Sequence, residues 1–308
     1  MDTRFAVVIV TYNRLPLLQE CIECVLNQTV KAKEIIIIDN ASSDGTQEYL
    51  KTLDKLERPQ IVIDRSSINE GGAGGFYRGI NAFLQSECDW VVLIDDDAML
   101  CAHYLEQLNC YINKMPDIKA FSGTVLTDGQ IITEHRRRLL NQQVIIEKKV
   151  DLEEYELPYF TYDLTSFCGI AFAKSIIEKT GLPYKDFFIW YDDTEYSFRV
   201  RKYSRIVNIN CISLNHKTII DNDYSSEYEK RLNWKRYYGY RNKTFTLIKY
   251  GYKNYILRQN REALKKVAII FLFGKVPKSI AFYNLKLTWR GIRDGILGRL
   301  GKNKFYLP

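Results

Sequence analysis

Three consecutive aspartates at the end of an apolar segment are the residues of this chain best suited to chemistry. Asp95, Asp96 and Asp97 follow the run 90–94, which reads Trp-Val-Val-Leu-Ile. Side chains alternate along an extended strand, so Asp95 and Asp97 leave the sheet on one side while Asp96 points away. Two converging carboxylates suit Mg²⁺ or Mn²⁺, because these hard cations prefer oxygen ligands. A solvated acidic turn is the alternative explanation for any such triplet taken alone.

A second acidic cluster, Asp192, Asp193 and Glu195, follows the aromatic run 187–191. A helix cap would account for one of these acids, since carboxylates are favoured at a helix N-terminus. One cap does not need three acids beside aromatic rings. A carboxylate held against apolar rings tends to have a raised pKa, which suits a general base.

Four of the five residues at 71–75 are glycines. Backbone N–H groups in such a run can approach a ligand closely, and the helix that follows offers its positive end to a pyrophosphate. Neither the Gly-Lys-Ser/Thr of a P-loop nor a GxGxxG after the first strand is present, so a dinucleotide site of those kinds is not expected. We interpret the run as a phosphate-binding segment rather than a flexible loop.

Polar residues after other strand-like runs are weaker candidates. Thr11 and Asn13 follow the first run and Asp39 the second, where side chains can hydrogen-bond a nucleobase and ribose. The same residue types are common in ordinary turns. His216 follows the strand expected at 206–214; a lone histidine is usually structural, but at a strand end it can reach a metal held by the aspartates.

Strand and helix patterns alternate through the first hundred residues and would position these side chains. This βαβαβαβ series predicts a parallel, doubly wound sheet whose carboxyl ends carry the ligand site. The third helix is expected at 75–86, after the glycine run. The buried strands are expected at 5–10, 34–39, 61–63 and 90–94.

The pattern divides the chain into a catalytic domain at 1–220 and a helical, basic region at 221–308. Within the catalytic domain, 1–100 is expected to bind the nucleotide and 101–220 to form the acceptor half. The fold class is accordingly α/β, with a mainly parallel central sheet flanked by helices and a helical C-terminal extension. A basic loop at 136–138 is compatible with a solvated turn.

Charge and cysteine content indicate the expected cellular location and partners of this chain. Seven cysteines without a paired zinc-binding spacing predict reduced thiols, and no charged-then-apolar leader opens the sequence. A cytoplasmic location is therefore expected. Residues 255–308 hold twelve Lys or Arg against two acids, interleaved with apolar residues, which favours a polyanionic partner such as a membrane surface. No nucleic-acid-binding module is recognisable, so nucleic acid is not expected as a partner.

Seven segments, in order, carry a resemblance to a known family. They read VVIVTYNR at 7–14, IIIIDNASSDGT at 35–46, NEGGAGGF at 69–76, IDDDA at 94–98, WYDDTEY at 190–196, NH at 215–216 and YRN at 240–242. With these segments the chain resembles glycosyltransferase family 2 enzymes of the Rossmann-like GT-A fold, which use nucleotide-sugar donors and invert the anomeric centre. It is most similar to the galactofuranosyltransferases and related rhamnosyltransferases of bacterial cell-surface polysaccharides.

The resemblance implies a role for each matching residue. Asp95 and Asp97 match the metal-binding pair, and His216 matches the third protein ligand. Asp193 matches the catalytic base, and Asp192 beside it is also expected to be catalytic. Contacts with the donor are then expected from Thr11, Asn13, Asp39, Asn69, Gly71, Gly72, Gly74, Gly75, Arg78 and Asp96.

On the acceptor side, the resemblance implies that Trp190 and Asp192 shape the site and that Glu195 contributes to it. Tyr191 departs from the family pattern, because some relatives have a Trp directly before the acid pair. This departure leaves the identity of the acceptor-side aromatic open.

The implied activity is inverting, metal-dependent transfer of a sugar from a nucleotide-diphosphate donor to a saccharide acceptor, with Mn²⁺ or Mg²⁺ as cofactor. The acceptor is expected to be linked to a polyprenyl diphosphate at the inner face of the membrane, and the chain to be peripheral there. UDP-galactofuranose and dTDP-rhamnose are the favoured donors, ahead of UDP-galactopyranose or UDP-glucose. A nucleotidyltransferase of similar fold and a non-catalytic sugar- or nucleotide-binding protein are the alternatives, and self-association is open.

Overall fold

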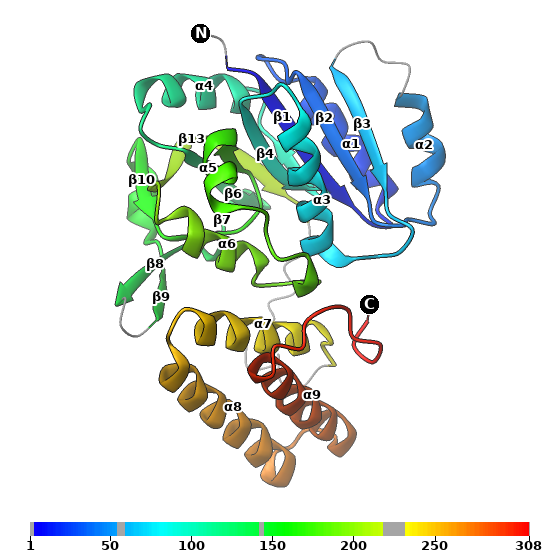
Figure 1. Cartoon of the computed structure of the whole chain (residues 1–308), viewed down its shortest axis with the longest axis vertical. Coiled ribbons are helices and arrows are strands. Elements are labelled where there is room, and N and C mark those ends of the chain that lie inside the picture. The colour runs from blue at the N-terminus through cyan, green and yellow to red at the C-terminus, as the bar shows by residue number, and fades with distance from the viewer. Residues whose placement is uncertain (1–2, 54–58, 142–144, 218–231, 308) are drawn as a thin grey trace. The chain divides into compact units, whose positions relative to one another are not determined.

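The computed structural model of the chain describes residues 3–53, 59–141, 145–217 and 232–307. It forms two compact units (Figure 1). The first unit comprises 1–139, 147–185 and 193–218, and the second comprises 140–146, 186–192 and 219–308. The domain boundary expected at residue 220 lies outside the described residues.

The first unit is built on a ten-stranded sheet with β1 near its middle. Strands β4, β1, β2 and β3 are neighbours and run parallel, as the alternating sequence pattern predicts. Beyond β4 the direction changes, because β12 is antiparallel to both β4 and β6. The long strand β13 then runs parallel to β6 and antiparallel to β10. The unit is thus an α/β fold with helices on both faces of a mixed sheet, as the sequence predicts.

The elements of the first unit have the following bounds: β1 Phe5–Thr11, α1 Leu15–Leu26, β2 Glu34–Asp39, α2 Thr46–Leu53, β3 Gln60–Arg65, α3 Gly71–Gln85, β4 Trp90–Asp95, β5 Ala98–Leu100, α4 Tyr104–Lys114, β6 Ala120–Thr127, β7 Gln130–Ile131, β8 Arg136–Asn141, β9 Ile146–Lys149, β10 Tyr159–Tyr162, β11 Leu164–Thr165, β12 Ile170–Ala173, α5 Lys174–Thr180, α6 Asp192–Val200 and β13 Ile206–His216.

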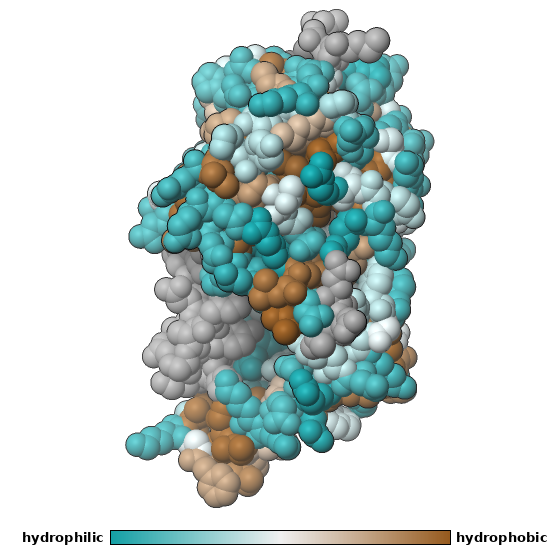
Figure 2. All heavy atoms as spheres, turned by 90° about the vertical axis from the view of Figure 1, so that its left-hand side faces the viewer, coloured by the Kyte–Doolittle hydropathy of each residue, from teal (hydrophilic) through white to brown (hydrophobic). Residues whose placement is uncertain are grey.

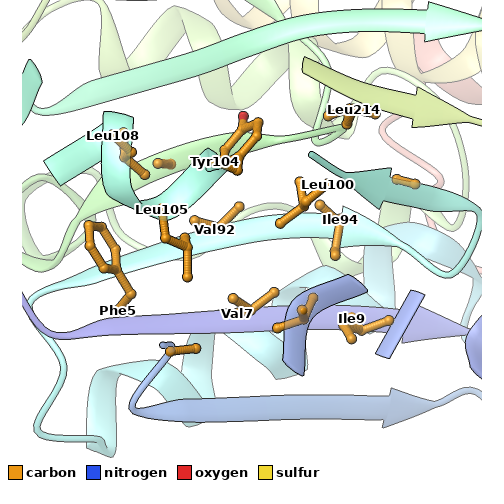
Figure 3. Packing of buried hydrophobic residues seen from close by; sticks show 14 of the residues in the cluster. Phe5, Val7, Ile9, Val92, Ile94, Leu100, Tyr104, Leu105, Leu108 and Leu214 are labelled. Atoms are coloured by element: carbon orange, nitrogen blue, oxygen red, sulfur yellow. The ribbon is translucent and has the colours of Figure 1, made fainter. Parts of the chain in front are cut away.

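Both faces of the central strands are buried, which explains their continuous apolar sequences. Alternate residues of β1 enter separate cores: Phe5, Val7 and Ile9 pack on one side, in the same cluster as residues of α4 such as Leu105 (Figure 3). Val8 and Val10 pack on the other side, against α3. This two-sided burial fixes the register of the strands, so the carboxyl ends of β1, β2 and β4 lie at one edge.

The glycine run lies within a helix rather than in a loop before it, so the expected start of the third helix at residue 75 is wrong. Helix α3 begins at Gly71. A Cβ on Gly75 would lie 2.4 Å from Cγ1 of Val10, and one on Gly79 would lie 2.3 Å from Cγ1 of Val8. These glycines therefore allow α3 to approach β1 closely.

The basic run at 136–138 is not a solvated turn. Arg136 begins β8 and is 0% exposed. Its guanidinium donates to the carbonyl oxygens of Gly123 and Cys168 and, through Nε, to Oδ1 of Asn208. Three separate strands or strand connections thus share one buried cation, which the sequence alone does not reveal.

Within its described residues, the second unit contains the helices α7 Lys235–Lys249, α8 Lys253–Phe273 and α9 Lys278–Ile296. Helices α7 and α9 cross closely, because a Cβ on Gly291 would lie 2.6 Å from the carbonyl oxygen of Tyr237. The hydroxyl of Tyr237 also donates to Asp294 at 2.7 Å. Among the described residues, no helix is both long enough and apolar enough to cross a membrane.

Replacing Gly79 by alanine should lower the free energy of unfolding by about 1–3 kcal/mol, because the new methyl group overpacks the contact with Val8. Gly72→Ala is the matched control in the same helix, since no heavy atom lies within 4 Å of its Cβ position. Urea denaturation of both variants measures the difference. Equal stability of the two would contradict the close helix–sheet contact.

Candidate active site

Two carboxylates and one imidazole converge at the carboxyl edge of the sheet. Asp95 ends β4, Asp97 lies in the turn that follows, and His216 ends β13. One ligand atom from each lies within 4.8 Å of the others. Asp97 and His216 are 2% and 16% exposed at their side chains, and Nε2 of His216 is 3.3 Å from Oδ1 of Asp97.

The sheet itself brings His216 to the aspartates across 119 positions of sequence. Strand β5, which directly follows the aspartates, pairs antiparallel with β13, and the register places His216 opposite Ala98. The backbone N–H of Lys217 then donates to the carbonyl oxygen of Asp97 at 2.8 Å. His216 is thus part of the strand rather than beyond its end.

These three residues fit a divalent cation. Two carboxylate oxygens and one imidazole nitrogen form a donor set that Mn²⁺ and Mg²⁺ accept. Ligands about 2.1 Å from such an ion lie roughly 3–4 Å apart, which is compatible with the observed spacing. Nδ1 of His216 is buried without a hydrogen-bond partner among the described residues, and the ring packs against that of His135, with centroids 5.7 Å apart.

Arg14 balances the negative charge of the aspartates. Its Nη1 lies 2.6 Å from Oδ2 of Asp97 and 3.3 Å from Oδ1 of Asp96. Asp96 also accepts from the hydroxyl of Thr11 at 2.7 Å. Burial raises the pKa of Asp96 to about 6, against the lowering effect of Arg14 and of the Thr11 hydrogen bond. Asp96 therefore joins β1 to the aspartate turn, and it shares Nη1 of Arg14 with Asp97.

The other residues expected to bind the nucleotide lie at the ends of β1 and β2. Asp39 is 0% exposed, and its Oδ1 accepts from the backbone N–H of Ser42 at 2.8 Å. Asn13 adopts a left-handed conformation with φ 53°. Its Oδ1 accepts from the backbone N–H of Ser43 at 2.7 Å, so this side chain ties β1 to the loop after β2. Helix α1 begins at Leu15, and Asn13 does not cap it.

The residues expected to contact the pyrophosphate differ in how much space and which partners they have. Oδ1 of Asn69 accepts from the backbone N–H of Gly71, which opens α3. Gly72 has open space at its Cβ position, whereas Gly74 faces Cβ of Glu70 at 2.5 Å. Arg78 is engaged by two acids, Asp64 and Glu70. Among these glycines, Gly72 is therefore the one with open space beside it.

Asp193 lies in the first turn of α6, the helix that begins at Asp192. Its Oδ1 accepts from the backbone N–H of Thr194 at 2.5 Å and from the hydroxyl of Thr194 at 3.1 Å. Among the described residues, its Oδ2 accepts no hydrogen bond. Burial raises the pKa of Asp193, and the charge of Arg137 and the hydrogen bonds from Thr194 oppose this rise. A carboxylate with one anchored and one available oxygen is well arranged to accept a proton.

The two acids beside Asp193 have different surroundings. Glu195 is 0% exposed, and its Oε2 accepts from Nε and Nη2 of Arg199 at 3.1 and 2.7 Å. The same arginine donates to the carbonyl oxygens of Thr180 and Leu182. Glu195 is thus paired inside the fold. Asp192, the first residue of α6, is 6% exposed.

The aromatic segment before α6 has an unusual backbone within the second unit. Phe188, Trp190 and Tyr191 all have positive φ, at 64°, 64° and 75°. Each such non-glycine residue costs about 1–3 kcal/mol unless the surroundings enforce it, and such residues cluster at functional sites. The segment includes Trp190, which is 39% exposed.

Asn242 enforces this backbone. Its Nδ2 donates to the backbone carbonyl oxygens of Phe187, Ile189 and Trp190, at 3.0, 3.1 and 2.8 Å. Arg241 donates to the carbonyl oxygens of Asp186 and Phe187 at 3.0 and 2.9 Å. The YRN segment, to which the sequence assigns no role, therefore holds the segment that presents Trp190.

Sequence reasoning missed several residues that contact the candidate site. Arg14 stands inside the TYNR segment, yet only the threonine and asparagine were expected to contribute. The side chain of Thr194 donates to Asp193 and that of Arg137 donates to Thr194, and both contacts depend on the fold. The YRN segment marks Asn242 as a residue of interest, but its role cannot be predicted from the sequence, because its partners are backbone carbonyl groups.

The chain belongs to glycosyltransferase family 2. The family model described as "Glycosyl transferase family 2" matches residues 6–178, which include the aspartate triplet and the glycine run. The fold and the family together make this protein a glycosyltransferase.

Relatives with curated names are similar over different shares of the chain. The dTDP-rhamnosyl transferase RfbF of Shigella flexneri is 24% identical over 210 residues, which cover 68% of this chain and 67% of RfbF. The galactofuranosyltransferase GlfT1 of Mycolicibacterium smegmatis is 22% identical over 264 residues, 79% of this chain and 83% of GlfT1. A GalNAc(5)-diNAcBac-PP-undecaprenol beta-1,3-glucosyltransferase of Campylobacter jejuni is 29% identical over 145 residues, 42% of this chain and 46% of that protein.

Solved structures share the fold. A crystal structure of GalNAc-T7 with UDP, GalNAc and Mn²⁺ superposes with a TM-score of 0.64 at 17% identity and covers 96% of this chain and 58% of that one. The S. aureus TarS 1–349 structure gives a TM-score of 0.53 at 11% identity, over 96% of this chain and 72% of that one.

We expect Mn²⁺ to bind the wild-type chain and to bind Asp97→Asn at least about tenfold more weakly, because the variant loses a ligand charge. Asp89→Asn is the matched control, since Asp89 pairs with Arg4 at the surface rather than with the cluster. Electron paramagnetic resonance of free Mn²⁺ measures both affinities. Equal binding by the two variants would place the metal elsewhere.

Proposed function

We propose that this protein is an inverting, divalent-metal-dependent glycosyltransferase that moves a sugar from a nucleotide-diphosphate donor to a saccharide acceptor in surface polysaccharide synthesis. The observation that carries the proposal is the convergence of Asp95, Asp97 and His216 at the carboxyl edge of a family 2 fold. In open α/β sheets this edge is where nucleotides bind. A nucleotidyltransferase or a non-catalytic binding protein of similar fold is less compatible with the family.

Asp95, Asp97 and His216 would hold the cation, and Arg14 would remain beside it as a further positive charge. When bound, the cation supplies charge neutralisation for the diphosphate as it leaves the sugar. The N-terminus of α3 is proposed to approach the same phosphates at Gly72, because the N–H of Gly71 already donates to Asn69. Thr11, Asn13 and Asp39 are proposed to contact the nucleoside, as the resemblance implies.

Asp193 is proposed as the base. Its Oδ2 takes the proton of an acceptor hydroxyl while that oxygen forms a bond to the anomeric carbon. The bond between the anomeric carbon and the diphosphate oxygen breaks on the opposite side, so one displacement inverts the configuration and releases the nucleoside diphosphate. The logic parallels inverting glycoside hydrolysis, with a sugar hydroxyl in place of water. Trp190 and Asp192 are proposed to shape the acceptor site.

The names of two relatives favour two donor classes, dTDP-rhamnose and UDP-galactofuranose. Saturation-transfer NMR, with UDP, dTDP and the two sugar nucleotides in competition, separates them. A preference for the UDP pair supports galactofuranosyl transfer, and a preference for the dTDP pair supports rhamnosyl transfer. Binding of none of the four in the presence of Mg²⁺ would contradict the proposal.

Asp193→Asn should lower the turnover of sugar transfer by roughly 10²–10⁴-fold, the usual contribution of a general base. Donor binding should stay near the wild-type value, because the variant keeps the metal cluster and the α3 terminus. Nucleoside diphosphate release measures turnover, and the NMR titration measures binding. Near-wild-type turnover would place the base on another residue.

The C-terminal helices are proposed to bind the inner leaflet, where a polyprenyl-diphosphate-linked acceptor would lie. Apolar side chains gather around the connection between α8 and α9, at the lower end of the view in Figure 2. Phe273 is 81% exposed, and Leu272, Ile269 and Phe282 are each more than half exposed. Basic residues flank this apolar tip: Lys265, Lys266, Lys275, Lys278 and Lys286. Apolar groups with a basic rim are typical of interfacial helices that bind anionic lipid.

The double variant Leu272→Ser/Phe273→Ser should bind phosphatidylglycerol vesicles at least about tenfold more weakly, since burying each apolar side chain contributes roughly 1.5–3 kcal/mol. Tyr203→Ser is the matched control, because Tyr203 is 57% exposed in the first unit. Vesicle co-sedimentation measures both. Unchanged binding of the double variant would contradict the membrane proposal.

A further inference from the structure

The hairpin formed by β8 and β9 reaches the acidic cluster through one arginine. Nη2 of Arg137 donates to the hydroxyl oxygen of Thr194 at 2.8 Å, and Nη1 pairs with the carboxylate of Glu147. Glu147 lies on β9 and Arg137 on β8, so the pair also joins the two strands of the hairpin. The side chains of Arg137 and Glu147 are 23% and 17% exposed, which makes their interaction stronger than that of a surface pair.

The hydroxyl of Thr194 has only one proton to donate, and the contact with Arg137 sets the direction of that O–H bond. Because the guanidinium occupies a lone pair of the hydroxyl oxygen, the proton is directed away from Arg137. It is donated to Oδ1 of Asp193 at 3.1 Å, beside the bond from the Thr194 backbone N–H. Two donors thus hold Oδ1, and Oδ2 is left without a hydrogen bond among the described residues.

We infer that Arg137 is a positioning residue for sugar transfer, which orients Asp193 through the Thr194 hydroxyl so that Oδ2 is the oxygen that accepts the proton. The inference rests on the proposed function, in which Asp193 is the base. Arg137 does not itself contact the reacting atoms. The segment that carries it would thereby couple the hairpin to the chemical step.

The same hairpin brings two opposite charges to Asp193. Burial raises the pKa of this carboxyl; the charge of Arg137 lowers it and the charge of Glu147 raises it. From α6 the hydrogen bonds of Thr194 also lower it. A base must be deprotonated to act, so transfer falls as the pH drops through the pKa of Asp193. Removing Arg137 should therefore move the acid limb to higher pH, and neutralising Glu147 should move it to lower pH.

The neighbouring arginine provides a matched control. Arg138 lies on the same strand and has a similar ion pair, with Glu154. Its Nε and Nη2 donate to the carbonyl oxygen of Thr161 rather than to α6. Loss of Arg138 removes a charge and a hairpin contact of comparable kind, but it removes no partner of Thr194.

The test is the pH profile of kcat for the full chain, with the donor that the NMR competition selects. Arg137→Met should lower kcat at neutral pH by roughly 10–100-fold, the effect of misplacing a catalytic group, and should shift the acid limb upward. Glu147→Gln should shift the limb downward, and Arg138→Met should leave it in place. The KM for the donor should be unchanged in all three.

If Arg137→Met folds poorly, three further variants still test the inference: Arg137→Lys, Thr194→Val and Thr194→Ser. Arg137→Lys keeps the positive charge but loses the planar guanidinium that contacts Thr194 and Glu147 together. The acid limb of its pH profile should therefore stay near that of the wild type, while kcat falls. Thr194→Val should resemble Arg137→Met, and Thr194→Ser should restore activity because it keeps the hydroxyl.

Two results would overturn the inference. One is an acid limb that moves equally in Arg137→Met and Arg138→Met, and the other is wild-type kcat in Thr194→Val. If Asp193→Asn is inactive and either result is found, only the role of Arg137 fails. If Asp193→Asn remains active, the proposed base fails as well.

Discussion

The concentration of negative charge at the end of β4 is the constraint on which the rest of the site depends. Three adjacent carboxylates, two of them nearly closed to solvent, are costly unless positive charge or hydrogen-bond donors meet them. The fold supplies Thr11 and Arg14 from the end of β1, and His216 from the end of β13. Asp96 takes the structural contacts, which leaves Asp95 and Asp97 to form the cluster with His216. A divalent cation is the natural complement to the charge that remains.

The strand ends at the carboxyl edge of the sheet can be predicted from the sequence, because each is marked by a local pattern of residues. Apolar runs followed by polar residues mark the ends of β1, β2 and β4, and two-sided burial forces those ends together. The parallel arrangement and the GT-A fold are confirmed for that reason. Family membership rests on the same segments, since the family match covers residues 6–178.

What the sequence could not predict are interactions between side chains and distant backbone. Arg136 looks like a surface charge until Gly123, Cys168 and Asn208 surround it. Asn242 acts on carbonyl groups more than fifty residues away, which carry no side-chain signal. The glycine run was read as ligand contact alone, yet Gly75 is required by the packing of α3 on Val10. Such contacts are set by tertiary structure, and each one holds a segment that carries candidate site residues.

The central claim is that this edge binds a nucleoside diphosphate together with a divalent cation. The most direct test is ³¹P NMR of UDP and of dTDP with the protein and a trace of Mn²⁺, whose paramagnetism broadens phosphorus signals within a few ångströms. The account predicts broadening of both phosphate signals of the preferred nucleotide with the wild-type protein. It also predicts loss of that broadening in the Asp95→Asn/Asp97→Asn double variant. Nucleotide binding with sharp phosphate signals, or equal broadening in the double variant, would contradict the account.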